Sequence, residues 1–251
     1  MNVNWSKYSA PQAFYPLAGR LIPWFAVVAV ALMGVGLYMG FFVAPTDFQQ
    51  GESYRIIFVH VPAAWMSMFL YVVMAIWAGV GMGLNARLSF MMAQAIAPTG
   101  AMFTFLALLT GAMWGKPTWG AWWVWDARLT SELILLFQYA GVMLLRTSID
   151  DMRRADRSSA VFSLVGVVNV PIIYFSVQWW NTLHQGASVS MSTGSKMAAT
   201  MLMAMLIMTV AFWLYSIAVI LARVRCIVVE RDSLPVWDEK PAVIQEAVEA
   251  R

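Results

Sequence analysis

Cysteine, histidine and charged residues are scarce in this chain of 251 residues, which has one Cys and two His and only 12% Asp, Glu, Lys or Arg. A single cysteine, Cys226, excludes a disulfide framework and a cysteine metal site within the chain. The sequence also has no glycine-rich phosphate loop and no dinucleotide-binding fingerprint. Any thiol chemistry or ATP hydrolysis would therefore come from a partner protein.

Hydrophobic residues are abundant instead, at 61% of the chain against roughly 45–50% in an average soluble domain. Six apolar stretches are close to or longer than the about 20 residues that a helix needs to cross a bilayer. They lie at about 21–43, 56–84, 92–113, 129–146, 160–178 and 197–221. The predicted fold class is an all-α integral membrane protein with six transmembrane helices. We expect a membrane domain at 1–225 and a soluble cytoplasmic tail at 226–251, and Pro11 and Pro16 discourage a long helix before about Leu21.

The basic residues predict the orientation, because Lys and Arg are retained on the cytoplasmic side during insertion. Of the 16 Lys and Arg residues, the connections after the first, third and fifth spans hold only Arg55, Lys116, Arg128 and Lys196. Both termini are therefore predicted to be cytoplasmic, with these three connections in the periplasm. The remaining basic residues are scattered over short loops, so a net charge of +3 does not indicate nucleic-acid binding.

The segment 114–130, WGKPTWGAWWVWDARLT, is predicted to be a periplasmic loop between the third and fourth spans. It contains five tryptophans, namely Trp114, Trp119, Trp122, Trp123 and Trp125. An aromatic belt at the membrane interface explains isolated tryptophans such as Trp24, but it explains this cluster poorly. Gly115, Pro117 and Gly120 would let the backbone turn and aim several rings at one flat ligand. If residues 122–126 are helical, Trp122 and Asp126 share a face, and Asp126 could hold Arg128 or a loop amide.

The two histidines, His60 and His184, are both predicted at the membrane depth of this loop. A single histidine there is more often bonded to a neighbouring carbonyl group or to water. Two imidazoles can, however, occupy both axial positions of a haem iron, while aromatic rings stack on the macrocycle and bases such as Lys116 or Arg128 meet its propionates. The many methionines, including Met205, are more simply explained as apolar filler than as iron ligands.

The spacing W-G-x-x-x-W-G-x-W-W-x-W-D-x-R in 114–128 closely resembles the WWD signature of the haem-handling proteins of cytochrome c maturation. With six predicted spans and one outward histidine on each side of the motif, the chain resembles the haem exporter protein C family over essentially its whole length. Larger haem lyases of the same superfamily have more spans and extra histidines. The resemblance implies haem b held by His60 and His184 as axial iron ligands. It also implies cofactor-binding roles for the five tryptophans, Asp126 and Arg128, and no catalytic residue.

The resemblance further implies a function at the periplasmic face of the bacterial inner membrane. Haem would be bound there and delivered to a periplasmic, membrane-anchored haem chaperone. The other implied partners are a two-component ABC transporter, with ATPase and permease subunits, and a small single-span subunit. Such a protein is not an enzyme, although it can assist covalent attachment of haem to the chaperone. Two alternatives stay open, namely a haem b electron-transfer subunit and a haem-free permease or docking subunit.

Overall fold

The structure is a computed structural model that describes residues 8–184, 189–190, 194–195 and 197–233. Six helical segments within this part are long and apolar enough to cross a membrane, which confirms the predicted fold class. They are α1 (Pro11–Tyr38) with its π-helical end η2 (Met39–Val43), α2 (Ile57–Leu84) after the 3-10 turn η3 (Glu52–Ile56), α3 (Arg87–Trp119), α4 (Ala127–Ser148), α5 (Met152–Gly166) together with α6 (Asn169–Trp179), and α7 (Ala199–Ser233). Between α6 and α7, β1 (Val189–Ser190) pairs antiparallel with β2 (Gly194–Ser195).

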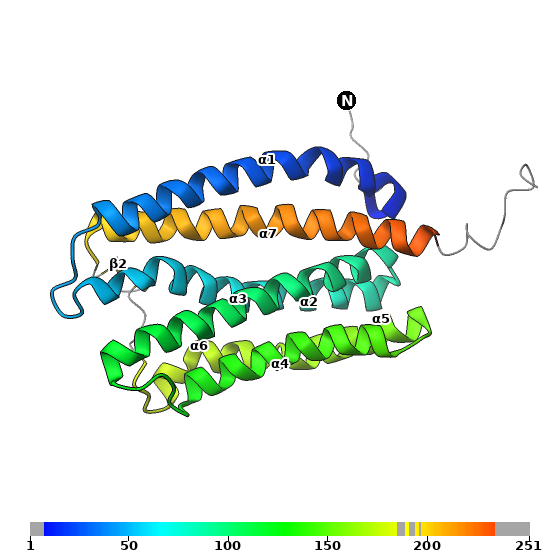
Figure 1. The fold of residues 1–251 in the computed structure, drawn as a ribbon. Coiled ribbons are helices and arrows are strands. Elements are labelled where there is room, and N and C mark those ends of the chain that lie inside the picture. The colour runs from blue at the N-terminus through cyan, green and yellow to red at the C-terminus, as the bar shows by residue number, and fades with distance from the viewer. Residues whose placement is uncertain (1–7, 185–188, 191–193, 196, 234–251) are drawn as a thin grey trace, which may run out of the picture.

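The helices form a bundle in which α2 and α3 lie in the middle (Figure 1). On one side α1 packs along α7, and on the other side α4 packs against α5 and α6. The connections after η2, α3 and α6 all lie at one end of the bundle, which we call the tryptophan end. The start of α1 and the last turn of α7 lie at the opposite end. The topology therefore brings both histidine-bearing regions and the tryptophan segment to the same end.

Two buried tyrosines tie the middle of the bundle together below the tryptophan end. The rings of Tyr71 on α2 and Tyr139 on α4 meet edge to face, with centroids 4.9 Å apart. Tyr139 also donates a hydrogen bond of 2.8 Å to the carbonyl oxygen of Ser67. Glycine is required at Gly100, because a Cβ atom there would lie 2.1 Å from Cζ of Tyr139. This close packing joins α2, α3 and α4 rigidly and so fixes the positions of the residues that they carry at the tryptophan end.

The first helix begins earlier than the sequence indicated. We expected the prolines to delay it to about Leu21, but α1 begins at Pro11 and passes through Pro16 and Pro23. A proline in the first turn costs no hydrogen bond, because the N–H groups there have no partner within the helix. The expectation about residues 1–20 was therefore wrong for residues 11–20.

The last helix continues beyond the predicted boundary at residue 225. It runs to Ser233, because Ile227 and Val228 are buried in the core and Arg231 pairs with Asp156 of α5 at 2.8 Å. Cys226 to Ser233 are thus part of α7. The rest of the predicted tail, residues 234–251, lies outside the described residues.

Candidate functional site

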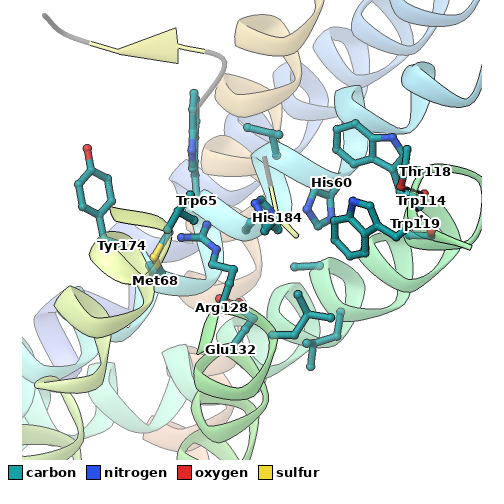
Figure 2. Close-up of a pocket in the computed structure, with 18 of the residues that line it drawn as sticks. His60, Trp65, Met68, Trp114, Thr118, Trp119, Arg128, Glu132, Tyr174 and His184 are labelled. Carbon is teal, nitrogen blue, oxygen red and sulfur yellow. Dashed lines mark hydrogen bonds between the residues drawn. The ribbon is translucent and has the colours of Figure 1, made fainter. Parts of the chain in front are cut away.

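A cavity opens between the helices at the tryptophan end (Figure 2). Its volume is about 230 Å³, somewhat below the roughly 300–1,000 Å³ of a usual small-molecule site, and it is partly open to the surface. Residues of α2, α3, α4, α6 and α7 line it, together with His184 from the connection after α6. The polar and aromatic lining residues are His60, Trp65, Trp114, Thr118, Trp119, Arg128, Glu132, Tyr174, Gln178 and His184. This lining therefore suits a ligand with apolar faces and a few polar groups.

The two histidines of the chain face each other across this cavity (Figure 2). His60 lies in the first turn of α2 and is buried, and half-buried His184 lies five residues beyond the end of α6. Their ring centroids are 6.3 Å apart and the ring planes are inclined by 36°. Sequence reasoning placed the two residues at the same depth, and the structure places them in one site.

Trp114 and Trp119 stand beside the two histidines. The ring of Trp114 meets His60 edge to face at 5.6 Å, and the ring of Trp119 lies 6.2 Å from that of His184. Both tryptophans lie in the last turns of α3 and not in a loop as expected, since the helix continues to Trp119 and ends at Gly120. Gly120 has a φ of 77°, a conformation in which glycine commonly ends a helix.

The other three tryptophans lie outside the cavity. Residues 121–126 are not helical, so the predicted shared face of Trp122 and Asp126 is wrong. Trp122 is 58% exposed and Trp125 is 77% exposed. The ring of Trp123 packs against that of Trp125 at 5.4 Å. The tryptophan segment is therefore divided, with two rings inside the cavity and an aromatic surface outside it.

Asp126 connects the start of α4 to the segment that carries His184. One carboxylate oxygen accepts a hydrogen bond of 2.8 Å from the backbone N–H of Leu129 and so caps α4. The other oxygen accepts a hydrogen bond from the hydroxyl group of Thr182. The Thr182 hydroxyl oxygen in turn accepts a hydrogen bond of 3.0 Å from the backbone N–H of His184. Asp126 thus binds a backbone amide of α4 and not a loop amide, and through Thr182 it also holds the histidine segment.

Two charged residues lie one helical turn apart on the face of α4 that lines the cavity (Figure 2). Arg128 is half-buried and donates one hydrogen bond, 2.6 Å long, to the carbonyl oxygen of Ile173. Glu132 is buried, and its Oε1 accepts a hydrogen bond of 2.6 Å from the hydroxyl of Ser67. Its Oε2 has no partner among the described residues. The cavity thus keeps cationic N–H donors of Arg128 available to a ligand, whereas the Oε2 atom of Glu132 is enclosed by protein.

The other basic candidates are directed elsewhere. Lys116 is exposed and donates to the carbonyl oxygen of Gly120 at 3.2 Å. Arg55 pairs with Glu52 and donates to the carbonyl oxygens of Gly40 and Ala44, which fixes the connection between α1 and α2. Among Arg55, Lys116 and Arg128, Arg128 is the one that lines the cavity, and Lys196 lies outside the described residues.

The donor set suits a metal that brings most of its own ligands. The described residues contain no group of three or more His, Cys, Asp or Glu side chains able to hold a bare metal ion. Two imidazoles alone leave a four-coordinate ion such as zinc incomplete. They complete the coordination of an iron that already has four ligands from a porphyrin.

The family model for heme exporter protein C, CcmC, matches residues 4–239 of this sequence. The chain belongs to the haem exporter protein C family. The haem exporter protein C of Escherichia coli K12 is 52% identical over 182 residues, which cover 72% of this chain and 74% of that protein. The corresponding protein of Bradyrhizobium diazoefficiens is 49% identical over 215 residues, or 86% and 81% of the two chains. That of Haemophilus influenzae is 43% identical over 230 residues, or 92% and 94%.

Several cavity residues of this haem exporter protein C family member were missed by sequence reasoning. Glu132 carried a signal, because an acidic residue inside a membrane span is a candidate functional residue by itself. Thr110, which contacts His60, and Gly111, which lines the cavity, carried none. Met205 of α7 was interpreted as filler, and it also lines the cavity.

Proposed function

We propose that this protein binds haem b, iron protoporphyrin IX, as its cargo between His60 and His184, and delivers it to a membrane-anchored haem chaperone during c-type cytochrome maturation. Two kinds of relative support the proposal by their names. Several are haem exporter C proteins, and one, from Marchantia polymorpha, is a putative mitochondrial cytochrome c biosynthesis protein that is 44% identical. The haem exporter name also supports membership in an exporter complex, and we propose an ABC transporter and a small single-span subunit as its other members.

The separation of the two imidazoles carries the proposal. With about 2 Å for each metal–nitrogen bond and about 1 Å from that nitrogen to the ring centre, two imidazoles on one metal have centroids roughly 6 Å apart. The observed 6.3 Å agrees with that separation. The histidines are 124 positions apart in the sequence and come from different segments, so chain continuity does not impose the agreement.

The rest of the cavity suits the macrocycle. Trp114 and Trp119 offer ring faces and edges close to the two imidazoles, where the faces of a porphyrin would lie. Arg128 supplies a planar fork of N–H donors that matches a carboxylate, and a haem propionate is such a group. Bound haem would supply an iron with both axial positions filled, which hinders reaction with oxygen. The role of this protein would be to bind the haem, orient it and present it to the chaperone.

The position of the cavity favours delivery over electron transfer. An electron-transfer haem is usually held by histidines within membrane helices, whereas His184 lies on a connection beyond the end of α6. Near the cavity, Trp122, Trp125, Trp179 and Trp180 are exposed at the same end of the bundle. Exposed aromatic side chains are common anchors of protein interfaces, and we assign this surface to the chaperone.

The orientation follows from charge. Arg55, Lys116 and Arg128 are the basic residues of the described tryptophan end, whereas most other Lys and Arg residues belong to the opposite end or its connections. The positive-inside rule then places the tryptophan end in the periplasm and both chain termini in the cytoplasm. The haem cavity would open to the outer face of the bacterial inner membrane, where the chaperone resides.

A haem titration of the purified full chain in detergent tests the proposal. We expect one haem per chain with the absorption spectrum of low-spin bis-imidazole iron, and transfer of that haem when the haem-free chaperone is added. A wild-type chain without low-spin haem would refute the binding site. Haem that stays on the chain and is rapidly and reversibly reduced by a quinol would favour the electron-transfer alternative.

The propionate contact can be tested at Arg128. The variant Arg128→Gln removes a charge-assisted hydrogen bond of about 1.5–3 kcal/mol and should raise the Kd for haem roughly 10–100-fold. Haem dimethyl ester, which lacks the carboxylates, should bind the variant and the wild type with similar affinity. Lys116→Gln is the matched control, because Lys116 is an exposed cation in the same region. An equal loss with the ester would show that Arg128 acts through packing instead.

A further inference from the structure

The ring of His60 is held from α3 by the hydroxyl of Thr110 and by the backbone of Ala107, one turn earlier. Its Nδ1 atom lies 3.0 Å from the hydroxyl oxygen of Thr110, and both side chains are buried. The same hydroxyl oxygen lies 2.6 Å from the carbonyl oxygen of Leu106, one turn earlier in α3. The Nδ1 atom of His60, the hydroxyl oxygen of Thr110 and the carbonyl oxygen of Leu106 therefore form two consecutive hydrogen bonds behind the ring.

The protons in these hydrogen bonds can be assigned by counting the donors and acceptors. The Leu106 carbonyl can only accept, and at 2.6 Å two oxygen atoms need a proton between them. Thr110 has one hydroxyl proton, so that proton goes to Leu106 and the Thr110 oxygen is left as an acceptor. The atom that faces it, Nδ1 of His60, must then be the donor. A neutral imidazole with its proton on Nδ1 has its free lone pair on Nε2.

We propose that Thr110 is a positioning residue that holds neutral His60 in the Nδ1–H tautomer, so that Nε2 is ready to bind iron before haem arrives. The proposal rests on the proposed haem-binding function for its consequence, although not for the tautomer itself. Metal-binding histidines commonly donate their second N–H group to a neighbouring acceptor, which orients the ring and makes it a better ligand. Here that acceptor is a threonine hydroxyl whose own proton is committed to the helix backbone.

The neighbouring residue adds a steric limit to the same ring. A Cβ atom at Gly111 would lie 3.0 Å from Cε1 of His60 and 3.6 Å from Nδ1. A side chain at this position would require the ring to move by a few tenths of an ångström. Thr110 and Gly111 together therefore determine the protonated nitrogen of His60 and the place where its ring lies against α3.

The tautomer can be measured without haem. In the haem-free chain labelled with 15N-histidine, only two imidazoles contribute signals, and the His184→Ala variant assigns them. At a pH where the ring is neutral, we expect the wild-type His60 signals of a protonated Nδ1 and an unprotonated Nε2. Thr110→Val should lose this preference, and Thr110→Ser, which keeps the hydroxyl, should retain it. Thr104→Val is the matched control, because Thr104 is a buried α3 threonine whose hydroxyl donates to the Gly100 carbonyl of its own helix.

Haem binding by the same variants gives the second readout. Loss of an outer hydrogen-bond partner of a metal ligand typically lowers affinity about 10–100-fold. We expect such a rise in the Kd for haem in Thr110→Val, with wild-type affinity in Thr110→Ser and Thr104→Val. A wild-type His60 with its proton on Nε2, or an unchanged tautomer in Thr110→Val, would overturn the proposal. A wild type that shows the expected tautomer but binds no haem would instead refute the haem function and leave the hydrogen-bond assignment standing.

Discussion

Low-spin haem binding by the purified chain is expected to disappear when either His60 or His184 is replaced by alanine. Each variant removes one of the two imidazoles whose rings lie 6.3 Å apart, and the remaining one can form only a single axial bond. The rise in Kd should exceed the roughly 10–100-fold that accompanies loss of an outer-shell partner, because an iron ligand itself is lost. Absorption spectra of the oxidised and reduced chains measure the effect directly.

Added imidazole separates loss of the ligand from loss of the fold. Free imidazole can enter the space left by His60→Ala or His184→Ala and supply the missing nitrogen, so the low-spin bands should partly return. Replacing Tyr174, a cavity residue that is 60% exposed, with phenylalanine should leave the spectrum unchanged. Normal haem content in both single histidine variants would contradict the proposed site, whatever the activity of the complex in cells.

The six helices could be predicted from the sequence because each depends on the average hydrophobicity of a long stretch of residues. Each span needs about 20 apolar residues, and one or two polar side chains do not hide such a stretch. Helix ends depend on single residues and were less predictable. Pro11 was interpreted as a residue that prevents a helix, although at the first position proline is well tolerated. Gly120 was interpreted as a residue that lets the backbone turn within a loop, although it ends α3 in a left-handed conformation.

The histidine pair was predictable for a different reason. The chain has only two histidines, and the alternation of spans puts both at the same end of the bundle. With so few candidates, the side of the membrane and the depth were enough to suggest one site. The five tryptophans could not be separated in this way, since they share one short segment. Which of them enter the cavity depends on where α3 ends, and that end was misplaced.

The contacts that orient the histidines could not be predicted from local pattern. Thr110 is 50 positions from His60, and Thr182 is 56 positions from Asp126. Threonine is common in membrane helices and is uncharged, so its residue type does not mark it as a candidate site residue. Only the packing of α3 against α2, and of the His184 connection against the start of α4, gives these two residues a role.

Asp126 is expected to act on haem binding through His184. The variant Asp126→Ala removes the acceptor of the Thr182 hydroxyl, and Thr182 holds the backbone N–H of His184. A hydrogen bond to a charged group contributes about 1.5–3 kcal/mol, so the Kd for haem should rise roughly 10–100-fold. Thr182→Val breaks the same connection from the other side and should cause a similar loss. Haem titration of both variants measures the effect.

Asp126 also caps α4, and this second role needs its own control. Asp151 caps α5 in the same way, accepting from the Arg154 N–H at 2.7 Å, but it lies at the opposite end of the bundle. Asp151→Ala should therefore lower thermal stability about as much as Asp126→Ala while leaving haem affinity unchanged.

A double-mutant cycle shows whether Asp126 and Thr182 act on haem binding as one unit. If Asp126 positions His184 through Thr182, the variant that carries both Asp126→Ala and Thr182→Val should bind haem no more weakly than Asp126→Ala alone. Either substitution already breaks the same hydrogen-bonded connection. Losses that add in full would mean that each residue contacts the cargo or the fold independently. Non-additive losses would show that Asp126, the residue before α4, acts on the haem site through the segment that carries His184.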